Sequence, residues 1–139
     1  MLRRILYTSR ATDGVSMKDA YDIIRVSHNR NAQAGITGGL IFIDGHFVQL
    51  MEGLPTAVEQ RYDRIAQDGR HHDLIVRQDV EIEAPVFADD WMALRDGSRI
   101  DSALLTRHSY LPGLPQDEFT GEQVFDLLTA CFEQELAAA

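Results

Sequence analysis

The stretch from residue 35 to residue 53 constrains the fold of this chain most strongly. Two apolar runs in it flank the pair Asp44 and Gly45. An Asp-Gly pair between apolar runs favours a two-residue hairpin turn, so residues 38–52 are predicted to form two antiparallel strands. The second of these strands carries one primary amide, Gln49, near its middle.

That amide needs polar partners. Gln49 shares a strand face with Phe47 and Met51, because successive side chains alternate between the two faces of a strand. A primary amide has two donor and two acceptor positions, and leaving it buried and unpaired costs about 1–3 kcal/mol. We therefore expect another polar side chain to meet Gln49 across this face.

The remaining periodicity predicts the order β-α-β-β-α-β-β. This order begins as the ferredoxin-like arrangement, an α+β fold whose antiparallel or mixed sheet carries two helices on one face. Capping boxes are expected at Ser16–Asp19, Thr56–Glu59 and Thr120–Gln123. The predicted elements are a strand at 3–10, a helix from Ser16 whose inward stripe runs to Asn31, the hairpin at 38–52, a helix opened by Pro55 and Thr56, and strands at 74–82 and 91–95.

The C-terminal part is predicted to be helical. A short helix is expected at 101–107, a Pro-Gly connection at 110–115, and a longer helix from Thr120 with apolar residues at helical spacing. A sheet with helices on one face leaves the other face bare. We expect these C-terminal helices to cover it.

Composition narrows the function classes. The 139 residues fit one domain, and a net charge of −9 with a pI of about 4.8 opposes binding to nucleic acid. No apolar run reaches the roughly 18 residues of a membrane span, so a cytoplasmic protein is expected. The single Cys131 excludes an intramolecular disulfide, and no His, Cys or carboxylate spacing indicates a metal site.

Three polar side chains are expected to converge. In a ferredoxin-like sheet the first and third strands are central neighbours, so Tyr7 and Gln49 should be cross-strand partners. Asn31, on the inward stripe of the first helix, would close the group. A phenol and two amides suit a flat heterocycle with alternating donors and acceptors. On spacing alone, a buried Tyr–Gln hydrogen bond that only stabilises the core is the stronger interpretation.

Several short segments of the chain follow one another at a characteristic spacing. They are Leu-Tyr-Thr-Ser-Arg at 6–10, Asn-Ala-Gln-Ala-Gly-Ile-Thr-Gly at 31–38 and Phe-Val-Gln-Leu-Met-Glu-Gly at 47–53, followed by Arg70-His71, Phe87 and Trp91-Met92. These segments resemble the BLUF domain, a family of flavin-binding blue-light sensors. Each segment is loose by itself, but together at this spacing they are specific. The resemblance covers about two-thirds of the chain.

The resemblance implies a role for each matching residue. Tyr7 would give an electron and then a proton to the excited flavin. Gln49 would stand between that phenol and the N5/C4 carbonyl edge of the flavin, where a change of its amide shifts the absorption to the red. The implied flavin contacts are Tyr7, Ile24, Asn31, Gln49, Arg70, His71 and Met92, and the implied signal relay is Met92 and Trp91. The implied cofactor is FAD, with FMN as an alternative.

One departure concerns the segment around the fifth strand. The family usually reads Phe-x-x-Trp-x-Met, whereas this chain reads Phe-Ala-Asp-Asp-Trp-Met at 87–92 and has Asp90 where the tryptophan is expected. Either Met92 or Trp91 can keep its register toward the flavin. The Met92 register is favoured, because it leaves the Asp90 charge at a strand end near solvent.

We expect residues 1–97 to form a flavin-binding core and residues 98–139 a helical extension within the same structural domain. The protein would be a photoreceptor with no enzymatic turnover of its own, signalling to a separate protein and forming a homo-oligomer. Two alternatives stay open. One is a light-insensitive BLUF-like interaction module, and the other is a small ferredoxin-like enzyme such as an acyl phosphatase, which would need an anion-binding loop with a catalytic arginine.

Overall fold

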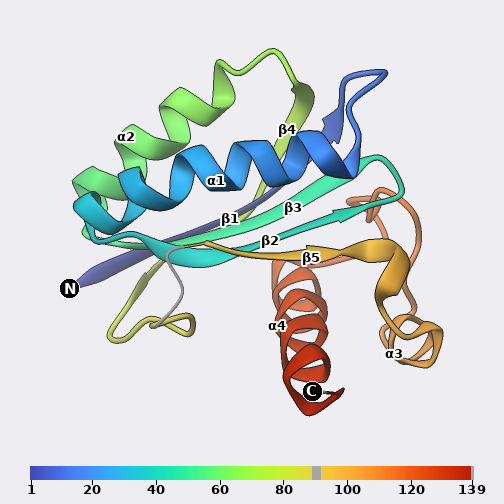
Figure 1. Ribbon diagram of the computed structural model, residues 1–139. Coiled ribbons are helices and arrows are strands. Elements are labelled where there is room, and N and C mark those ends of the chain that lie inside the picture. Colours follow the sequence, from blue (N-terminus) through green and yellow to red (C-terminus); the bar gives the residue numbers. More distant parts are fainter. Residues whose placement is uncertain (89–91, 139) are drawn as a thin grey trace.

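A computed structural model describes residues 1–88 and 92–138, and side chains as far as Glu133. Within these residues the chain forms one five-stranded sheet with helices on both faces (Figure 1). The elements are β1 (Leu2–Ala11), α1 (Met17–Ala34), β2 (Thr37–Ile43), β3 (His46–Gly53), α2 (Pro55–Ala66), β4 (His71–Ile82), β5 (Ala93–Asp96), the 3-10 helix η1 (Gly97–Arg99), α3 (Ser102–Arg107) and α4 (Gly121–Ala138).

The strands lie in the order β4-β1-β3-β2-β5. β1 pairs antiparallel with both β3 and β4, and β2 pairs antiparallel with β3. β5 joins the outer edge of β2 in parallel, which makes the sheet mixed. The predicted ferredoxin-like α+β fold and its order of elements are confirmed.

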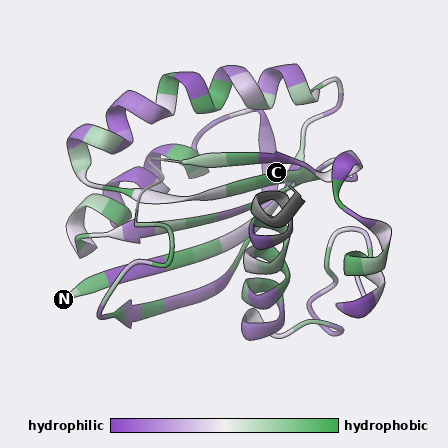
Figure 2. Cartoon of the chain, turned by 60° about the horizontal axis from the view of Figure 1, so that its bottom comes forward, coloured by the Kyte–Doolittle hydropathy of each residue, from purple (hydrophilic) through white to green (hydrophobic). Residues whose placement is uncertain are grey.

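Two apolar layers enclose the sheet. α1 and α2 cover one face, and α4 packs on the other, as predicted (Figure 1). The layer under α1 and α2 contains Ile5, Tyr7, Ala20, Ile36, Leu40, Phe47, Met51, Val58 and Met92. The layer under α3 and α4 contains Leu6, Ile41, Ile43, Val48, Leu50, Phe87, Leu104, Leu114, Phe119, Val124, Leu127, Leu128, Cys131 and Phe132. Figure 2 shows the hydrophobic residues concentrated along the central strands that these layers enclose.

The hairpin turn sets the register of β2 and β3. Asp44 and Gly45 both have positive φ angles, 49° and 74°, as the turn that favours Asp-Gly requires. Leu40 therefore lies directly opposite Gln49. The predicted hairpin is confirmed.

Two of the three predicted capping boxes are present. Asp19 accepts the backbone N–H of Ser16 at 2.8 Å at the start of α1. At the start of α4, the backbone N–H of Thr120 donates to the side chain of Gln123 at 2.8 Å, and the N–H of Gln123 donates back to the Thr120 hydroxyl at 3.1 Å. These reciprocal bonds satisfy N–H groups that have no partner within the helix.

The capping box predicted at Thr56–Glu59 was wrong. α2 begins at Pro55, so Leu54 occupies the N-cap and Thr56 already lies inside the helix. Proline suits this first position, because its fixed φ matches a helix and its missing N–H would be unpaired there in any case.

Two strand boundaries also differ from the prediction. β4 begins at His71 instead of residue 74, because the long β1 extends far enough to pair Ala11 with His71 and Arg10 with His72. β5 runs from Ala93 to Asp96, and the predicted start at Trp91 lies outside the described residues. For β4, the neighbouring strand β1, which the sequence pattern does not reveal, decides where pairing starts.

Gly38 on β2 lies close to the backbone of β3. A Cβ atom at this position would stand 1.9 Å from the carbonyl oxygen of Leu50, which is backbone and cannot move aside. Any side chain here would push the two strands apart.

We expect Gly38→Ala to lower the free energy of unfolding by about 2–3 kcal/mol, at the upper end of the cost of overpacking. The matched control is Gly69→Ala, because a Cβ atom there meets nothing within 4 Å and the backbone is not left-handed. Chemical denaturation of the two purified variants checks this. Equal stability of the two would show that the strands can separate at no cost.

Candidate functional site

A hydrogen-bonded chain of three side chains lies under α1. Tyr7 and Gln49 are direct partners in the pairing of β1 and β3, as predicted, and are only 2% and 7% exposed. The Tyr7 hydroxyl donates to Oε1 of Gln49. At its other end the Gln49 amide donates from Nε2 to the sulfur of Met92 at 3.4 Å. The amide thus joins a phenol to a thioether inside the core.

Burial controls the protonation of the phenol. Loss of solvent raises the pKa of Tyr7 above its ordinary value, and nearby Tyr62 and Asp68 raise it further. Tyr7 is therefore a neutral hydrogen-bond donor at physiological pH, and its proton points at Gln49.

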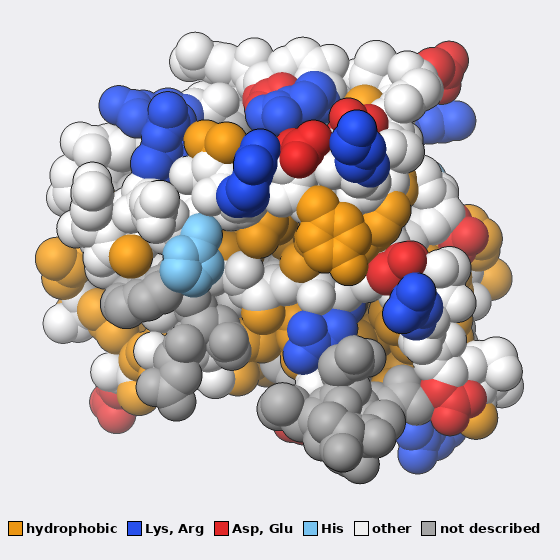
Figure 3. All heavy atoms as spheres, in the orientation of Figure 1, with side chains coloured by type: hydrophobic (Ala, Val, Ile, Leu, Met, Phe, Trp, Pro, Cys, Tyr) orange, Lys and Arg blue, Asp and Glu red, His pale blue; other side chains and the backbone are white. Residues whose placement is uncertain are grey.

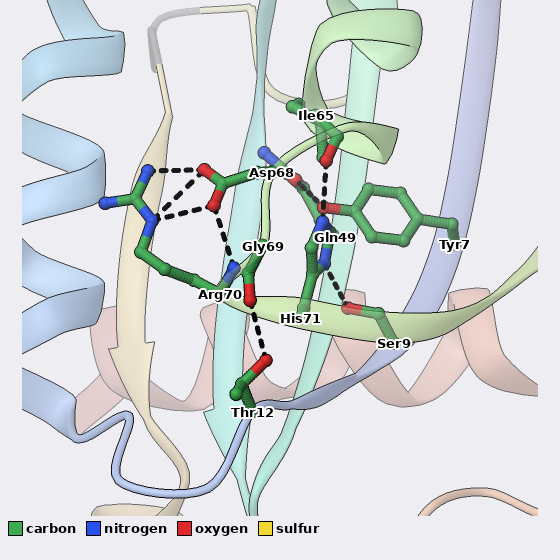
Figure 4. A network of polar contacts seen from close by, with 9 residues as sticks. All are labelled: Tyr7, Ser9, Thr12, Gln49, Ile65, Asp68, Gly69, Arg70 and His71. Carbon is green, nitrogen blue, oxygen red and sulfur yellow. Dashed lines mark hydrogen bonds and ion pairs between the residues drawn. The ribbon is translucent and has the colours of Figure 1, made fainter.

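His71 lies next to the hydrogen-bonded Tyr7 and Gln49 and has a hydrogen-bond partner at each of its two ring nitrogens. Its Nε2 donates to the carbonyl oxygen of Ile65 at 2.7 Å, and its Nδ1 lies 2.7 Å from the Ser9 hydroxyl (Figure 4). A carbonyl oxygen can only accept, so Nε2 carries a proton. The ring stands edge-on to Tyr7 and to Phe47, with centroids about 6 Å apart.

A small cleft opens beside Tyr7 and Gln49, between the sheet and the α1 and α2 layer. Its lining residues are Tyr7, Ile23, Ser27, Leu40, Phe47, Gln49, Ile65, Asp68, Arg70 and His71. The walls are mostly apolar, and the polar groups of Tyr7, Gln49, Asp68 and Arg70 converge on them. Such a slot suits a planar heterocycle with donors and acceptors on its edge.

The loop between α2 and β4 forms one end of the cleft. Arg70 donates from Nε to both carboxylate oxygens of Asp68, at 2.9 and 3.1 Å (Figure 4). This bond lowers the pKa of the Asp68 carboxyl below its usual value. Thr12 fastens the same loop by donating its hydroxyl to the carbonyl of Gly69 at 2.8 Å. The loop is thus tied to the end of β1.

The other predicted site residues lie around the cleft but do not line it. Asn31 is buried on α1, where its Oδ1 accepts from Nε of Arg61 at 2.9 Å. Ile24 packs into the apolar layer below α1, while its neighbour Ile23 faces the cleft. Met92 reaches the site through Gln49. Trp91 lies outside the described residues.

A second groove continues from the cleft and is lined by arginines. The groove shares five lining residues with the cleft, namely Ile23, Ser27, Ile65, Asp68 and Arg70. Its additional cations are Arg30 on α1 and Arg61 and Arg64 on α2. Burial, together with the charges of Arg30 and Arg64, lowers the pKa of Arg61.

These arginines form a local excess of positive charge in a chain of net charge −9. Figure 3 shows Lys and Arg side chains gathered over α1 and α2. One nitrogen of Arg61, Nη2, is buried without a hydrogen-bond partner. A cationic groove with a free donor suits an anionic group attached to whatever fills the cleft.

Sequence reasoning missed several of these residues. Leu40 could have been found, because the Asp-Gly turn fixes it opposite Gln49. Asp68 gives no such signal, because its position depends on the path of a loop. Arg61 and Arg64, three residues apart on α2, become a cationic pair facing Arg30 only when the two helices pack side by side.

The part of the chain that the structure describes was searched for clusters of metal-ligating side chains and for membrane-spanning helices. There, no three His, Cys, Asp or Glu side chains are grouped so that they could hold a metal ion. None of the described helices is both long and apolar enough to span a bilayer.

The chain was compared with known protein families and with individual proteins, and the matches given below are all to proteins described as responding to light. Residues 2–93 match the family described as sensors of blue-light using FAD, or BLUF. The chain is 39% identical over 90 residues to the photoactivated adenylate cyclase subunit beta of Euglena gracilis, a match that covers 65% of this chain and 10% of that protein. It is 35% identical over 75 residues to the blue light- and temperature-regulated antirepressor BluF of Escherichia coli, covering 54% of this chain and 19% of the relative.

Solved structures share the fold over nearly the whole chain. The dark-state structure of the BLUF protein BlrB superposes with a TM-score of 0.76 at 27% identity, covering 96% of each chain. By contrast, the chain spans only a tenth to a fifth of the length of the two curated relatives above. Because the family match extends over most of the residues that build the sheet and its α1 and α2 layer, this chain belongs to the BLUF family of blue-light sensors.

Proposed function

We propose that this chain is a blue-light photoreceptor that binds a flavin non-covalently in the cleft beside Tyr7 and Gln49. The observation that carries the proposal is the buried Tyr7–Gln49–Met92 chain, whose central amide lines the cleft. A purely structural pair would not need to open on a cleft. When bound, the flavin supplies the absorption of blue light and, once excited, takes up an electron.

Tyr7 is the proposed electron and proton donor. A neutral phenol loses an electron more readily when its proton has an acceptor to move to, and Oε1 of Gln49 already accepts that proton's hydrogen bond. The raised pKa keeps the phenol protonated until that moment.

Gln49 is the proposed switch. Its amide accepts at one end and donates at the other, so a change of orientation or tautomer exchanges the groups presented to Tyr7, to Met92 and to the cleft. The core around it is close-packed, so two discrete arrangements are favoured over a continuum.

The remaining contacts to the flavin are proposed because these residues lie at or near the cleft. Arg70 and His71 line the cleft near its α2 end. Asn31 and Ile24 lie on the α1 layer that covers the same sheet face, and we propose that they meet the ring from that side. Met92 relays the state of Gln49.

The arginine groove is proposed to hold the phosphate end of the flavin nucleotide. FAD is the preferred cofactor, and FMN also carries a phosphate that could reach Arg30, Arg61 and Arg64. Phosphate contacts of this kind add affinity without selecting the ring.

The output is proposed to leave through β5 and the helices on the opposite face. Asp68 is the sole carboxylate among the described residues lining the cleft, and it is paired with Arg70, so we propose a sensor without turnover of its own. The signal would pass to a separate protein, with a homo-oligomer as the working form.

The first experiment is the visible absorption spectrum of the purified protein before and after blue light. We expect a flavin band that shifts slightly to the red and recovers in darkness. A flavin band that does not shift would favour the light-insensitive interaction module. No binding after reconstitution with FAD would exclude the photoreceptor.

We expect Tyr7→Phe and Gln49→Leu to retain flavin and to lose the red-shifted state, because each removes one member of the proton path. Tyr62→Phe is the matched control, since its ring contacts Tyr7 edge-on at 5.7 Å and lies outside that path. Light-minus-dark difference spectra of the three variants decide. A normal shift in Tyr7→Phe or in Gln49→Leu would contradict the mechanism.

We expect Arg64→Gln and Arg30→Gln each to weaken FAD and FMN binding about fivefold, or ~1 kcal/mol, and to leave riboflavin binding unchanged. The small size reflects the exposure of both side chains. Arg25→Gln, an exposed position paired with Asp22 on the outside of α1, is the control. Titrations that show equal losses for riboflavin would remove the phosphate assignment.

A further inference from the structure

Glu52 is a carboxylate with no exposed surface. It lies on the face of β3 opposite to Gln49, because side chains alternate along the strand. Burying a charged group is costly unless it is paired and hydrogen-bonded. The hydrogen-bond donors to Glu52 therefore identify the parts of the chain that this carboxylate connects.

The two oxygens of the Glu52 carboxylate accept hydrogen bonds from different parts of the chain. Oε2 accepts from Arg4 on β1, with Nε at 3.0 Å and Nη2 at 2.9 Å. Oε1 accepts two successive backbone N–H groups, from Val86 at 2.8 Å and from Phe87 at 3.1 Å. A single side chain thus ties β3 both to its neighbouring strand and to the segment that follows β4.

That segment leads from Phe87 to Met92, whose sulfur accepts from the Gln49 amide. The strand β3 therefore holds the segment at two points, through Glu52 at its beginning and through Gln49 at its end. These two side chains are three residues apart in the sequence and lie on opposite faces of the sheet.

Two of the three residues bonded to Glu52 also touch α4. The Phe87 ring packs edge-on against Phe132, with ring centroids 5.1 Å apart and an interplanar angle of 79°. The Arg4 guanidinium lies over the ring of Phe125 at 4.3 Å. Glu52 is consequently the common anchor of two contacts between the sheet and the C-terminal helix.

We propose that Glu52 is a positioning residue of the signal relay. It fixes the backbone at Val86 and Phe87, so that a change in the Gln49–Met92 contact is passed to α4 through the contact between Phe87 and Phe132. This inference rests on the proposed function for the light-driven change at Gln49. The anchoring itself does not depend on light.

The test uses the flavin-loaded protein and the substitution Glu52→Gln. Glutamine keeps a single acceptor oxygen, so it can serve either the two backbone N–H groups or Arg4 but not both, and its neutral amide leaves the Arg4 charge unmatched. The control is Glu118→Gln, which removes an equal charge from an exposed position on the same side of the sheet. Hydrogen exchange of the backbone amides is measured in darkness and under blue light, together with the absorption spectrum.

We expect exchange of the Val86 and Phe87 amides in darkness to rise about tenfold in Glu52→Gln, equivalent to ~1.4 kcal/mol. The red shift should keep its size, while the light-induced change in exchange along α4 falls to less than about half. A merely structural role would not separate these two readouts. Unchanged exchange of the two amides in darkness would overturn the anchor.

Phe87→Leu provides an independent variant. It keeps both backbone bonds to Glu52 and removes the ring contact with Phe132. We expect wild-type protection of Val86 in darkness and a reduced light response in α4. A full α4 response in this variant would overturn the relay. If the wild-type protein shows no red shift, the proposed photoreceptor function fails, and the exchange in darkness still decides whether Glu52 is the anchor.

Discussion

The antiparallel pairing of β1 with β3 is the constraint on which the site depends. It places the Tyr7 phenol directly opposite Gln49, at the centre of a sheet covered on both faces. A slip of one residue in either strand would turn one of the two side chains to the opposite face and abolish the hydrogen bond. On the other side of β3, the Asp44–Gly45 turn sets the pairing with β2, which places Leu40 opposite Gln49.

The same strand carries polar groups on both of its faces. Gln49 faces the cleft, and Glu52 faces the layer under α4. Buried polar groups are stable only when they are bonded, so each has recruited a partner from the segment between β4 and β5. The sheet thereby connects the cleft with the C-terminal helix through side chains and not through a hinge between domains. In the proposed photoreceptor, these contacts would form a short path from the cleft to the opposite surface.

Much of the fold could be predicted from local signals. The hairpin follows from the Asp44-Gly45 turn. The first residues of α1 and α4 follow from capping boxes, whose two partners are three residues apart in the sequence. The errors arose where a distant element decides. β4 starts earlier than its apolar pattern suggests, because β1 reaches His71. The error at Thr56 has a local cause instead. Thr56 was predicted to cap α2, but the helix already begins at Pro55.

For the site, the sequence by itself determined the Tyr7–Gln49 pair, because strand order and side-chain alternation suffice to place both on one face. It also determined the family, through motifs at a specific spacing. The tertiary structure alone decided which side chains surround that pair. The arginine groove needs α1 and α2 to lie side by side, and the Glu52 anchor needs the segment after β4 to fold back onto β3. Such contacts join residues far apart in the chain, and no local periodicity encodes them.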